Sequence, residues 1–271
     1  NSPIPMGLLP PTLALSLSLG PNPPDADSLT QETRVYTYTY VNKVGAREVE
    51  SSPAPATLSS DVYPSQTVTL TGFSAPSSGY AATHVRIYRS TAGLYLFVAE
   101  ITLAVAIGSG FIDDVDPENL AEELPSLSWL APPDNLAGLT NLPNGNMAGF
   151  AGRDVYFCEP YVPHAWPDAY RQTLDHPVVG LGRMDTTLAV LTKGTPYLIQ
   201  GAHPDSVVVV KSDIEQACVS KRSIVSLNNL VFYCSPDGLV ALTPGGSQMI
   251  TENMFTYEQW QTQINPESVH A

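Results

Sequence analysis

An alternating run of aromatic and β-branched residues is the feature that most constrains this sequence. Residues 34–41 read RVYTYTYV, and Tyr36, Tyr38 and Tyr40 share one side of a period-two pattern. The other side holds only β-branched residues: Val35, Thr37, Thr39 and Val41. Such residues favour strands, and a period of two matches the alternation of side chains across a sheet. The run therefore predicts a β-strand with an aromatic face.

Short strands separated by turns continue from this run through the first part of the chain. Residues 42–45 (NKVG) predict a turn, residues 48–52 return as a strand, and Pro53 and Pro55 end it. Further strands are predicted at residues 68–71, 84–89, 94–101 and 110–114. This spacing indicates an immunoglobulin- or fibronectin-like β-sandwich over residues 32–116.

Proline-bearing segments flank the predicted sandwich. Prolines throughout residues 1–31 exclude a helix and predict an extended arm. Within this arm, residues 12–19 alternate apolar and small polar side chains, so they either add as a strand to another sheet or form a floppy leader. Residues 117–135 are acidic and contain prolines, which predicts a linker with a short helix over residues 118–124.

From residue 136 onward, apolar strands alternate with tight turns. Residues 146–158 and 178–192 each read as strand, turn and strand, and a further strand follows at residues 195–200. Residues 223–242 read as three strands joined by two turns. This unit recurs roughly every 40 to 50 residues, which is the repeat length of propeller blades. Residues 136–271 thus predict about two to three blades of a β-propeller, and a closed propeller needs at least four. Because the first residue is Asn rather than Met, we expect this chain to be part of a longer one.

The charge balance restricts the class of partner. The net charge is −14, from 12 Lys and Arg against 26 Asp and Glu. Such a surface repels phosphate backbones and anionic lipid headgroups, although it suits a channel wall past which DNA slides. The apolar residues 13–19 are too few to span a bilayer, so no membrane-spanning segment is predicted.

The three cysteines predict buried thiols in a reducing compartment, because Cys158, Cys218 and Cys234 form no CxxC pair. A catalytic pairing of Cys158 with His164 or His176 is disfavoured, since the neighbouring Glu159 would raise the cysteine pKa.

No catalytic, metal-binding or cofactor-binding residues are predicted. Asp113, Asp114 and Asp116 could hold a calcium ion, but no glycine-turned loop accompanies them, and we expect a solvated strand end. Residues 235–238 (SPDG) faintly resemble the turn of sialidase-type propellers, without its terminal Trp or paired carboxylates.

Aromatic residues gather in one proline-rich segment after residue 155. Four of its residues form a candidate protein-contact loop: Tyr161, His164, Trp166 and Tyr170. Aromatic anchors dominate contact energies at protein interfaces, which favours a docking role. The same cluster is also typical of a satellite core under a long loop, so both interpretations stay open.

Five strings in the second half form a recognisable set: residues 151–167 (AGRDVYFCEPYVPHAWP), 216–224 (QACVSKRSI), 235–240 (SPDGLV), 259–260 (QW) and 265–271 (NPESVHA). Together they resemble tail nozzle proteins of short-tailed bacteriophages, also described as tail tubular B-type or packaged-DNA stabilisation proteins. Residues 34–114 resemble a fibronectin-III-type insertion of the sort that phage tail proteins carry. The sequence departs from the family in being shorter.

The resemblance implies a structural virion protein of the phage tail, made in the bacterial host cytoplasm and without enzyme activity. It implies a β-propeller subunit of a homo-hexamer that contacts a tail adaptor and other tail proteins. Double-stranded DNA would pass through the lumen without sequence-specific binding. Two alternatives remain: a tail-associated binding module for a host glycan or another tail protein, and a propeller-type glycoside hydrolase.

Overall fold

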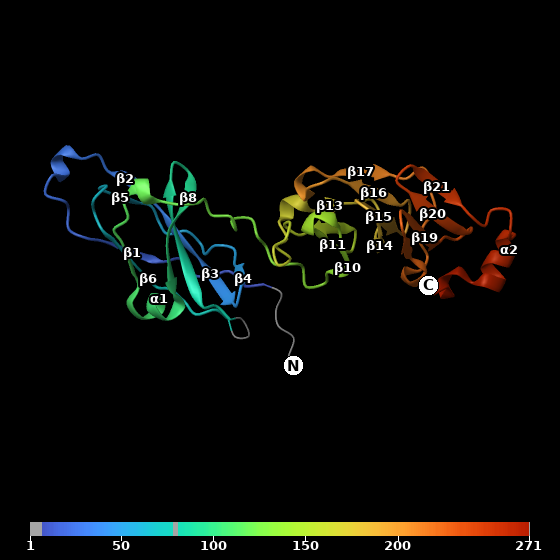
Figure 1. The fold of residues 1–271 in the computed structure, drawn as a ribbon, viewed down its shortest axis with the longest axis horizontal. Coiled ribbons are helices and arrows are strands. Elements are labelled where there is room, and N and C mark those ends of the chain that lie inside the picture. The colour runs from blue at the N-terminus through green and yellow to red at the C-terminus, as the bar shows by residue number, and fades with distance from the viewer. Residues whose placement is uncertain (1–6, 78–80, 271) are drawn as a thin grey trace. The chain divides into compact units, whose positions relative to one another are not determined.

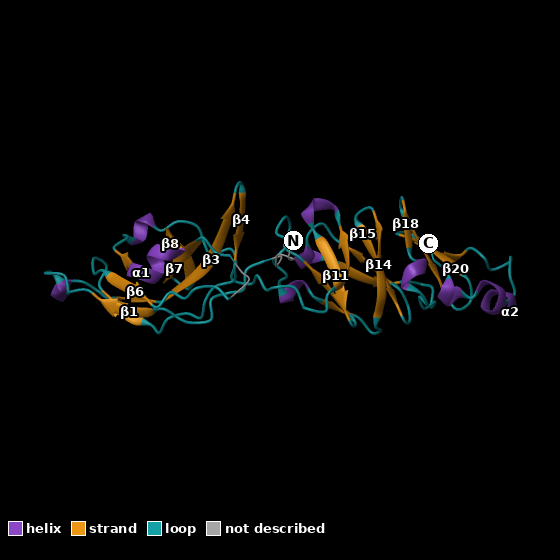
Figure 2. Cartoon of the chain, turned by 90° about the horizontal axis from the view of Figure 1, so that it is seen from below, coloured by secondary structure: helices purple, strands orange, loops and turns teal. Residues whose placement is uncertain are grey.

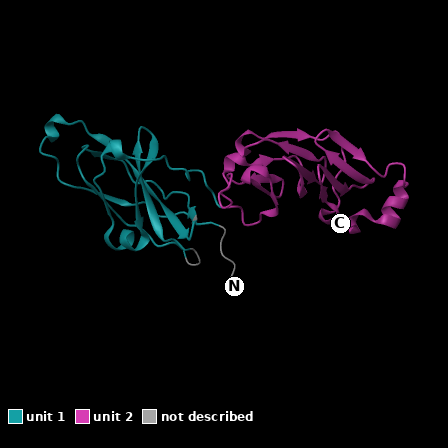
Figure 3. Cartoon of the chain, viewed as in Figure 1, with its two compact units in different colours: residues 1–131 teal, residues 132–271 magenta. Residues whose placement is uncertain are grey.

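The computed structural model describes residues 7–77 and 81–270. It is all-β, and its few helices are short, as Figures 1 and 2 show. The chain divides into two compact units, Asn1–Ala131 and Pro132–Ala271 (Figure 3). The predicted fold class, a sandwich followed by blades, is confirmed. We call the two parts the sandwich unit and the blade unit.

Two antiparallel sheets form the body of the sandwich unit. The larger sheet has the strand order β4 (Arg47–Glu50), β3 (Tyr36–Val44), β7 (His84–Thr91) and β8 (Leu94–Thr102). The smaller sheet has the order β1 (Ser16–Leu19), β6 (Val68–Thr71) and β9 (Phe111–Asp113). A separate pair joins β2 (Glu32–Arg34) to β5 (Ser60–Val62). The order of the larger sheet is that of the C′-C-F-G sheet of immunoglobulin-like folds.

The helical segments of the sandwich unit are η1 (Ala26–Ser28), α1 (Leu103–Ser109) and η2 (Pro117–Asn119). The Thr102 side chain accepts a hydrogen bond from the Val105 N–H and so caps α1. Gly110 ends α1 with φ of 71°, and a Cβ there would lie 2.4 Å from the Leu70 carbonyl oxygen. Only glycine lets the chain turn from α1 into β9 beside β6.

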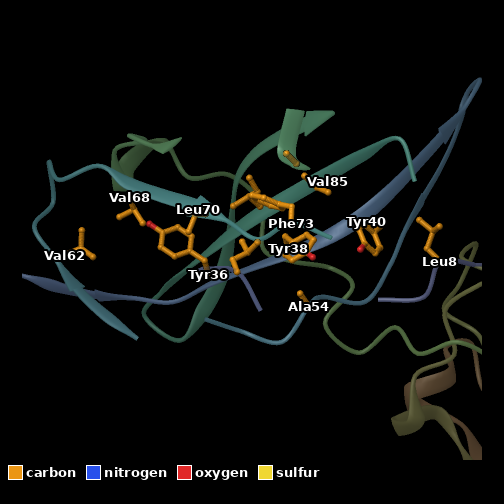
Figure 4. Close-up of a cluster of buried hydrophobic side chains, with 13 residues drawn as sticks. Leu8, Tyr36, Tyr38, Tyr40, Ala54, Val62, Val68, Leu70, Phe73 and Val85 are labelled. Atoms are coloured by element: carbon orange, nitrogen blue, oxygen red, sulfur yellow. The ribbon is translucent and has the colours of Figure 1, made fainter. Parts of the chain in front are cut away.

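The aromatic face predicted for residues 34–41 is confirmed. Tyr36, Tyr38 and Tyr40 are at most 2% exposed and pack in one core with residues of β6 and β7 (Figure 4). Phe73 meets Tyr38 edge to face at 5.0 Å. A buried tyrosine needs a partner for its hydroxyl group. The Tyr40 hydroxyl donates to the Ser74 carbonyl oxygen at 2.8 Å.

The same run is not a single strand, and in this respect the prediction is wrong. Arg34 belongs to β2 and pairs with β5, whereas Tyr36 begins β3 and pairs with β7. At the break, the Val35 N–H donates to the Ser90 hydroxyl oxygen at 2.9 Å, and the Ser90 N–H donates to the Val35 carbonyl oxygen at 2.8 Å. The Ser90 hydroxyl therefore takes the place of one backbone acceptor. At this point the chain passes from pairing with β5 to pairing with β7.

The segments predicted to be an extended arm and a linker both hydrogen-bond to strands of the sandwich. β1 pairs with β6, and Leu8 and Leu15 are buried in the sandwich core. At the other end, the Phe97 N–H donates to the Glu122 carbonyl oxygen at 2.9 Å, and the Leu124 N–H donates to the Tyr95 carbonyl oxygen at 2.8 Å. The helix predicted over residues 118–124 is reduced to the short turn η2, and residues 121–124 instead hydrogen-bond along the free edge of β8.

The blade unit consists of three consecutive antiparallel sheets of four strands, each in chain order. The first sheet contains β10 (Ala137–Asn141), β11 (Met147–Ala151), β12 (Asp154–Phe157) and β13 (Gln172–Thr173). The second sheet contains β14 (Val178–Met184), β15 (Thr187–Thr192), β16 (Tyr197–Gln200) and β17 (Val208–Lys211). The third sheet contains β18 (Val225–Leu227), β19 (Leu230–Cys234), β20 (Leu239–Thr243) and β21 (Gly246–Met249). Four-stranded meanders of this kind are propeller blades.

The connections of the blade unit contain only short helical turns. They are η3 (Pro143–Gly145), η4 (Asp168–Tyr170), η5 (Pro204–Ser206), η6 (Lys221–Ser223), α2 (Tyr257–Gln259), η7 (Trp260–Ile264) and η8 (Pro266–Ser268). Within residues 7–77 and 81–270, no helix has the length and apolar character needed to cross a membrane.

The strand β15 of the second sheet is buried on both faces because this sheet lies between the other two. All residues of β15 are buried. Leu188 and Val190 pack with residues of the first sheet, whereas Ala189 and Leu191 pack with residues of the third. The side chains of a strand alternate between its faces, so one strand serves two cores.

Candidate functional site: the aromatic loop of the first sheet

The candidate contact loop follows β12 and ends with η4. Its backbone is closed by its own hydrogen bonds. The Glu159 N–H donates to the Ala165 carbonyl oxygen at 2.8 Å, and the Ala165 N–H donates to the Val162 carbonyl oxygen at 3.0 Å. A bridge joins Glu159 to Val162. The loop is therefore a compact structure that holds its side chains in fixed directions.

Trp166 lies inside this loop. Its side chain is 2% exposed, and its indole N–H donates to the Pro163 carbonyl oxygen at 3.0 Å. For this residue the burial favours the alternative interpretation, a small core under a long loop. The tryptophan supports the loop from within.

Tyr161 is the residue that the loop presents to solvent. Its side chain is 79% exposed, and its φ of 62° places a non-glycine residue in the left-handed region. The Tyr161 N–H donates to the Gly145 carbonyl oxygen at 3.0 Å, which holds this backbone conformation. A Cβ on Gly145 would lie 2.5 Å from the Tyr161 ring, so one face of the ring lies on the glycine. Tyr161 is thus an exposed aromatic side chain whose backbone is held by a hydrogen bond to Gly145.

Tyr170 joins the loop to the second sheet. Its hydroxyl donates to Glu159 Oε2 at 2.8 Å, and its ring meets His203 edge to face at 5.8 Å. Burial, together with the Glu159 carboxylate, raises the pKa of Tyr170 to about 12. His164 is half-buried. The loop therefore brings together the four predicted residues, but only Tyr161 projects into solvent.

Cys158 is poorly suited to nucleophilic chemistry. Its thiol is fully buried, and the sulfur accepts the Met147 N–H at 3.1 Å. Burial raises the pKa of Cys158, and the negative charge of Glu159 acts in the same direction. Nucleophilic cysteines need the opposite shift.

The solvated strand end predicted for Asp113, Asp114 and Asp116 is wrong for Asp113 alone, since Asp114 and Asp116 are exposed. Asp113 is 0% exposed, and its Oδ2 accepts hydrogen bonds from Arg89 at 2.8 Å and from the Tyr36 hydroxyl at 2.6 Å. Asp113 therefore forms a buried ion pair with Arg89. Within residues 7–77 and 81–270, no group of three or more His, Cys, Asp or Glu side chains could hold a metal ion.

Other segments of the chain form hydrogen bonds with the SPDG turn of the third sheet, residues 235–238, and with the residues beside it. The Ser235 carbonyl oxygen accepts the Trp260 indole N–H at 2.9 Å, and Asp237 Oδ2 accepts the Gln216 side-chain amide at 2.6 Å. The Tyr233 hydroxyl donates to the Gln216 carbonyl oxygen at 2.8 Å. Three of the strings singled out in the sequence, residues 216–224, 235–240 and 259–260, therefore meet at one place in the fold.

Sequence reasoning missed a cavity of about 460 Å³ on the outer face of the larger sandwich sheet. Its walls include Glu48, Arg86, Tyr88, Phe97, Glu100 and Glu122. Arg86 forms ion pairs with Glu100 at 2.9 Å, with Glu50 at 2.7 Å and with Glu48. Tyr88 and Phe97 meet edge to face at 6.0 Å. The lining comes from β4, β7, β8 and a loop, so no local pattern reveals it.

Three solved structures are remotely similar to this chain. No protein-family model and no curated protein matches the sequence. Hsv2 of Kluyvelomyces marxianus aligns with a TM-score of 0.32 and 10% identity, over 70% of this chain and 48% of that protein. A protein of unknown function from Bacteroides thetaiotaomicron VPI-5482 aligns with a TM-score of 0.30 and 9% identity, over 91% of this chain and 62% of that one.

PorZ, an essential bacterial surface component of the type-IX secretion system of Porphyromonas gingivalis, aligns with a TM-score of 0.23 and 12% identity, over 72% of this chain and 30% of PorZ. This chain thus spans less than two thirds of each of these proteins. The architecture described above rests on the strand pairing of the chain itself.

Proposed function

We propose that this protein is a structural subunit of a short-tailed bacteriophage virion, a tail nozzle protein that retains and conducts packaged DNA. In this role it forms a homo-hexameric ring, contacts the tail adaptor and other tail proteins, and catalyses no reaction. It is made in the cytoplasm of the bacterial host.

The observation that carries the proposal is the position of the strings that resemble the nozzle family. The strings at residues 216–224, 235–240 and 259–260 lie together on the turn of the third sheet, where hydrogen bonds join them. These three segments therefore share a structural role, because their hydrogen bonds hold the third sheet in place. A rigid stack of sheets is what a conduit wall requires.

The acidity of the chain supports the same role. A net charge of −14 leaves little attraction for a phosphate backbone, so duplex DNA can slide past without being retained. We expect no retardation of a DNA duplex by the purified protein at low salt, where phosphate contacts are strongest. Micromolar binding that weakens steeply with salt would contradict a passive wall.

The decisive experiment is performed on purified virions. Quantitative mass spectrometry should find six copies of this protein per tail, and cryo-electron microscopy should place them in one ring on the tail axis. A ring of another symmetry refutes the hexamer, and absence of the protein from virions refutes the proposed function.

The cavity of the sandwich unit favours the alternative of a glycan-binding module. Aromatic rings and carboxylates along one concave surface are typical of sites that bind polar ligands. A glycan array that shows binding by the intact protein, lost in Phe97→Ala, would support this alternative. Trp166→Ala is unsuitable for this test because Trp166 is buried.

A further inference from the structure

The cavity on the outer face of the larger sandwich sheet lies within one unit and has the size of a small-ligand site, about 460 Å³. Strands β4, β7 and β8 supply part of its lining, and residues 121–123 with Pro125 supply the rest. The Phe97 N–H donates to the Glu122 carbonyl oxygen at 2.9 Å, and the Ala121 N–H donates to the Phe97 carbonyl oxygen at 3.1 Å. These backbone bonds hold the second wall against β8.

The side-chain donors of this cavity are already engaged. Among the described residues of the lining, Arg86 and Tyr88 are those whose side chains can donate hydrogen bonds. Each of the three Arg86 nitrogens bonds a different glutamate, Glu100 at 2.9 Å, Glu50 at 2.7 Å and Glu48. The Tyr88 hydroxyl donates to Glu50 Oε1 at 2.7 Å. A ligand therefore meets no donor that is free to bond it.

The acceptors of the cavity are in excess. Its lining contains four carboxylates and one guanidinium, which is a net charge of −3. Glu48 and Glu100 bond Arg86 and also Lys43, at 3.5 Å and 2.5 Å from the lysine Nζ. Glu122 and Glu123 are exposed, and within residues 7–77 and 81–270 neither carboxylate has a side-chain partner. These two carboxylates are thus free to accept hydrogen bonds.

The apolar part of the lining is aromatic. Tyr88 and Phe97 meet edge to face at 6.0 Å, and Phe97 is half-buried, so part of its ring is accessible. The faces of aromatic rings attract cations, and aliphatic chains of amines pack on apolar surfaces while their charged ends stay at polar groups. The cavity therefore combines an apolar floor with carboxylates at its wall.

We propose that this cavity binds an alkylammonium group, carried either by a lysine side chain of a partner protein or by a free amine. An ammonium group has three donors and no acceptor, so it matches a lining whose free polar groups are all acceptors. A sugar hydroxyl is a poorer match, because it accepts as well as donates. The aliphatic stem packs on Tyr88 and Phe97, and the charge is balanced by Glu122 and Glu123. This site belongs to the sandwich unit and does not depend on assembly of a ring.

Two probes of equal length separate charge from shape in isothermal titration calorimetry of the full chain at low ionic strength. 1,5-Diaminopentane should bind at one site. 1,5-Pentanediol, with a hydroxyl in place of each ammonium, should bind at least roughly tenfold more weakly, because it forms no charge-assisted hydrogen bonds. Equal binding of the two probes overturns the proposal, and so does the absence of diamine binding.

A pair of charge-matched variants excludes general attraction to an acidic chain. Glu122→Gln combined with Glu123→Gln should weaken diamine binding roughly tenfold, because it removes the two free carboxylates. Glu252→Gln combined with Glu258→Gln removes the same charge at exposed positions of the blade unit and should bind as wild type does. Equal weakening in the two variants overturns the proposal.

The aromatic floor is tested by Phe97→Leu, which keeps an apolar side chain and removes the ring. Diamine binding should weaken roughly fivefold, as loss of a cation–π contact does, while the melting curve stays that of a folded chain. Phe111→Leu is the control, because it removes another half-buried ring of the same unit, in β9 outside the cavity lining. Affinity that Phe97→Leu leaves unchanged overturns the placement of the amine in this cavity.

The source of the ammonium group is distinguished by two probes that carry one charge each. Tighter binding of N-acetyl-lysine methylamide than of pentylamine indicates a lysine side chain, and the reverse order indicates a free amine. A glycan that binds the intact protein when the diamine does not overturns this inference and supports the glycan-binding alternative. Absence of the protein from virions removes only the proposed function, whereas failure of the diamine to bind removes only this inference.

Discussion

The core strand β3 of the sandwich unit and the middle strand β15 of the blade unit are both deeply buried, but their surroundings differ in kind. Beside β3, the Tyr36 hydroxyl and the Arg89 guanidinium both donate to Asp113, and all three side chains are at most 1% exposed. Beside β15, the neighbours are aliphatic and aromatic side chains of two other sheets. One core contains a buried ion pair, whereas the buried polar side chains in and beside β15, such as Thr187 and Thr192, are uncharged.

The ion pairs at the surfaces of the sandwich unit and the blade unit also differ in kind. In the sandwich unit, Arg86 bonds three glutamates across the outer face of the larger sheet. In the blade unit, the ion pairs of the described residues join exposed side chains, such as Arg171 with Asp168. Because buried charge lies in the sandwich unit, removal of charge should damage the sandwich unit, whereas changes of side-chain volume should damage the blade unit.

The largest expected effect is that of Arg89→Leu. The substitution leaves the Asp113 carboxylate buried without its cation, which costs about 3–5 kcal/mol of folding free energy. Urea unfolding followed by circular dichroism should show an earlier transition of the sandwich unit and an unchanged transition of the blade unit. The control is Arg171→Leu, which removes an exposed pair. A loss below about 1 kcal/mol would mean that Arg89 adds little to this core.

Leu191→Ala is the corresponding test of the blade unit. Leu191 is 0% exposed between the second and third sheets, so truncation leaves a cavity and costs about 2–5 kcal/mol. Calorimetry should show that only the blade transition moves. Leu227→Ala, at a position that is 55% exposed, should change stability by less than about 0.5 kcal/mol. Equal effects of the two substitutions would contradict a tight seam.

Gly182→Ala tests how closely the second and third sheets approach. A Cβ on Gly182 would lie 2.6 Å from Val231 Cγ1, so the added methyl group should cost about 1–3 kcal/mol by overpacking. The cost should shrink in a Val231→Ala background, which a double-mutant cycle measures. Gly108→Ala in α1 is the control, because no atom lies within 4 Å of its Cβ position. A cost unchanged by Val231→Ala would refute the close contact.

The smallest expected effect is a pH dependence of the sandwich unit. Burial alone would raise the pKa of Glu100, but hydrogen bonds from Lys43 and Arg86 outweigh it and hold this pKa below its ordinary value. The lowered pKa stabilises the folded state above the ordinary pKa of glutamate, and this contribution is lost as the pH falls through the folded value.

Glu100→Gln should therefore be less stable than wild type at neutral pH and should approach it below about pH 4. The urea midpoint of the sandwich transition across this range measures the difference, with Glu118→Gln as the exposed control. A pH-independent difference would show that Glu100 acts through packing and not through charge.

Periodicity explains which parts of the fold were predictable. The aromatic face of β3 follows from alternation alone, and so do the strand pairs of the blades. The ion pair of Arg89 with Asp113 could not be predicted, because its partners are 24 residues apart and charged side chains are ordinarily exposed. The string LVFYC of β19 is apolar on both sides, so it gave no sign that Val231 and Tyr233 would face the second sheet.

The sequence predicted where the candidate loop lies in the chain, but it did not predict which of the loop's side chains are buried. Trp166 and Tyr161 are both large aromatic residues in a proline-rich segment, and composition cannot tell which of them is buried. The difference arises from local hydrogen bonds: the Trp166 indole finds an acceptor three residues earlier, and the Tyr161 backbone takes a left-handed conformation beside Gly145. Tyrosine rarely adopts this conformation, so its sequence gives no signal for it.

The two seams on β15 also bear on synthesis at the ribosome. The first sheet emerges before the other two sheets of the blade unit, so one seam can form as soon as the second sheet has left the ribosome. The other face of β15 has to wait for residues of the third sheet, such as Val231 and Tyr233. Until then a nascent chain exposes one apolar sheet face, which is the kind of surface through which incomplete chains associate.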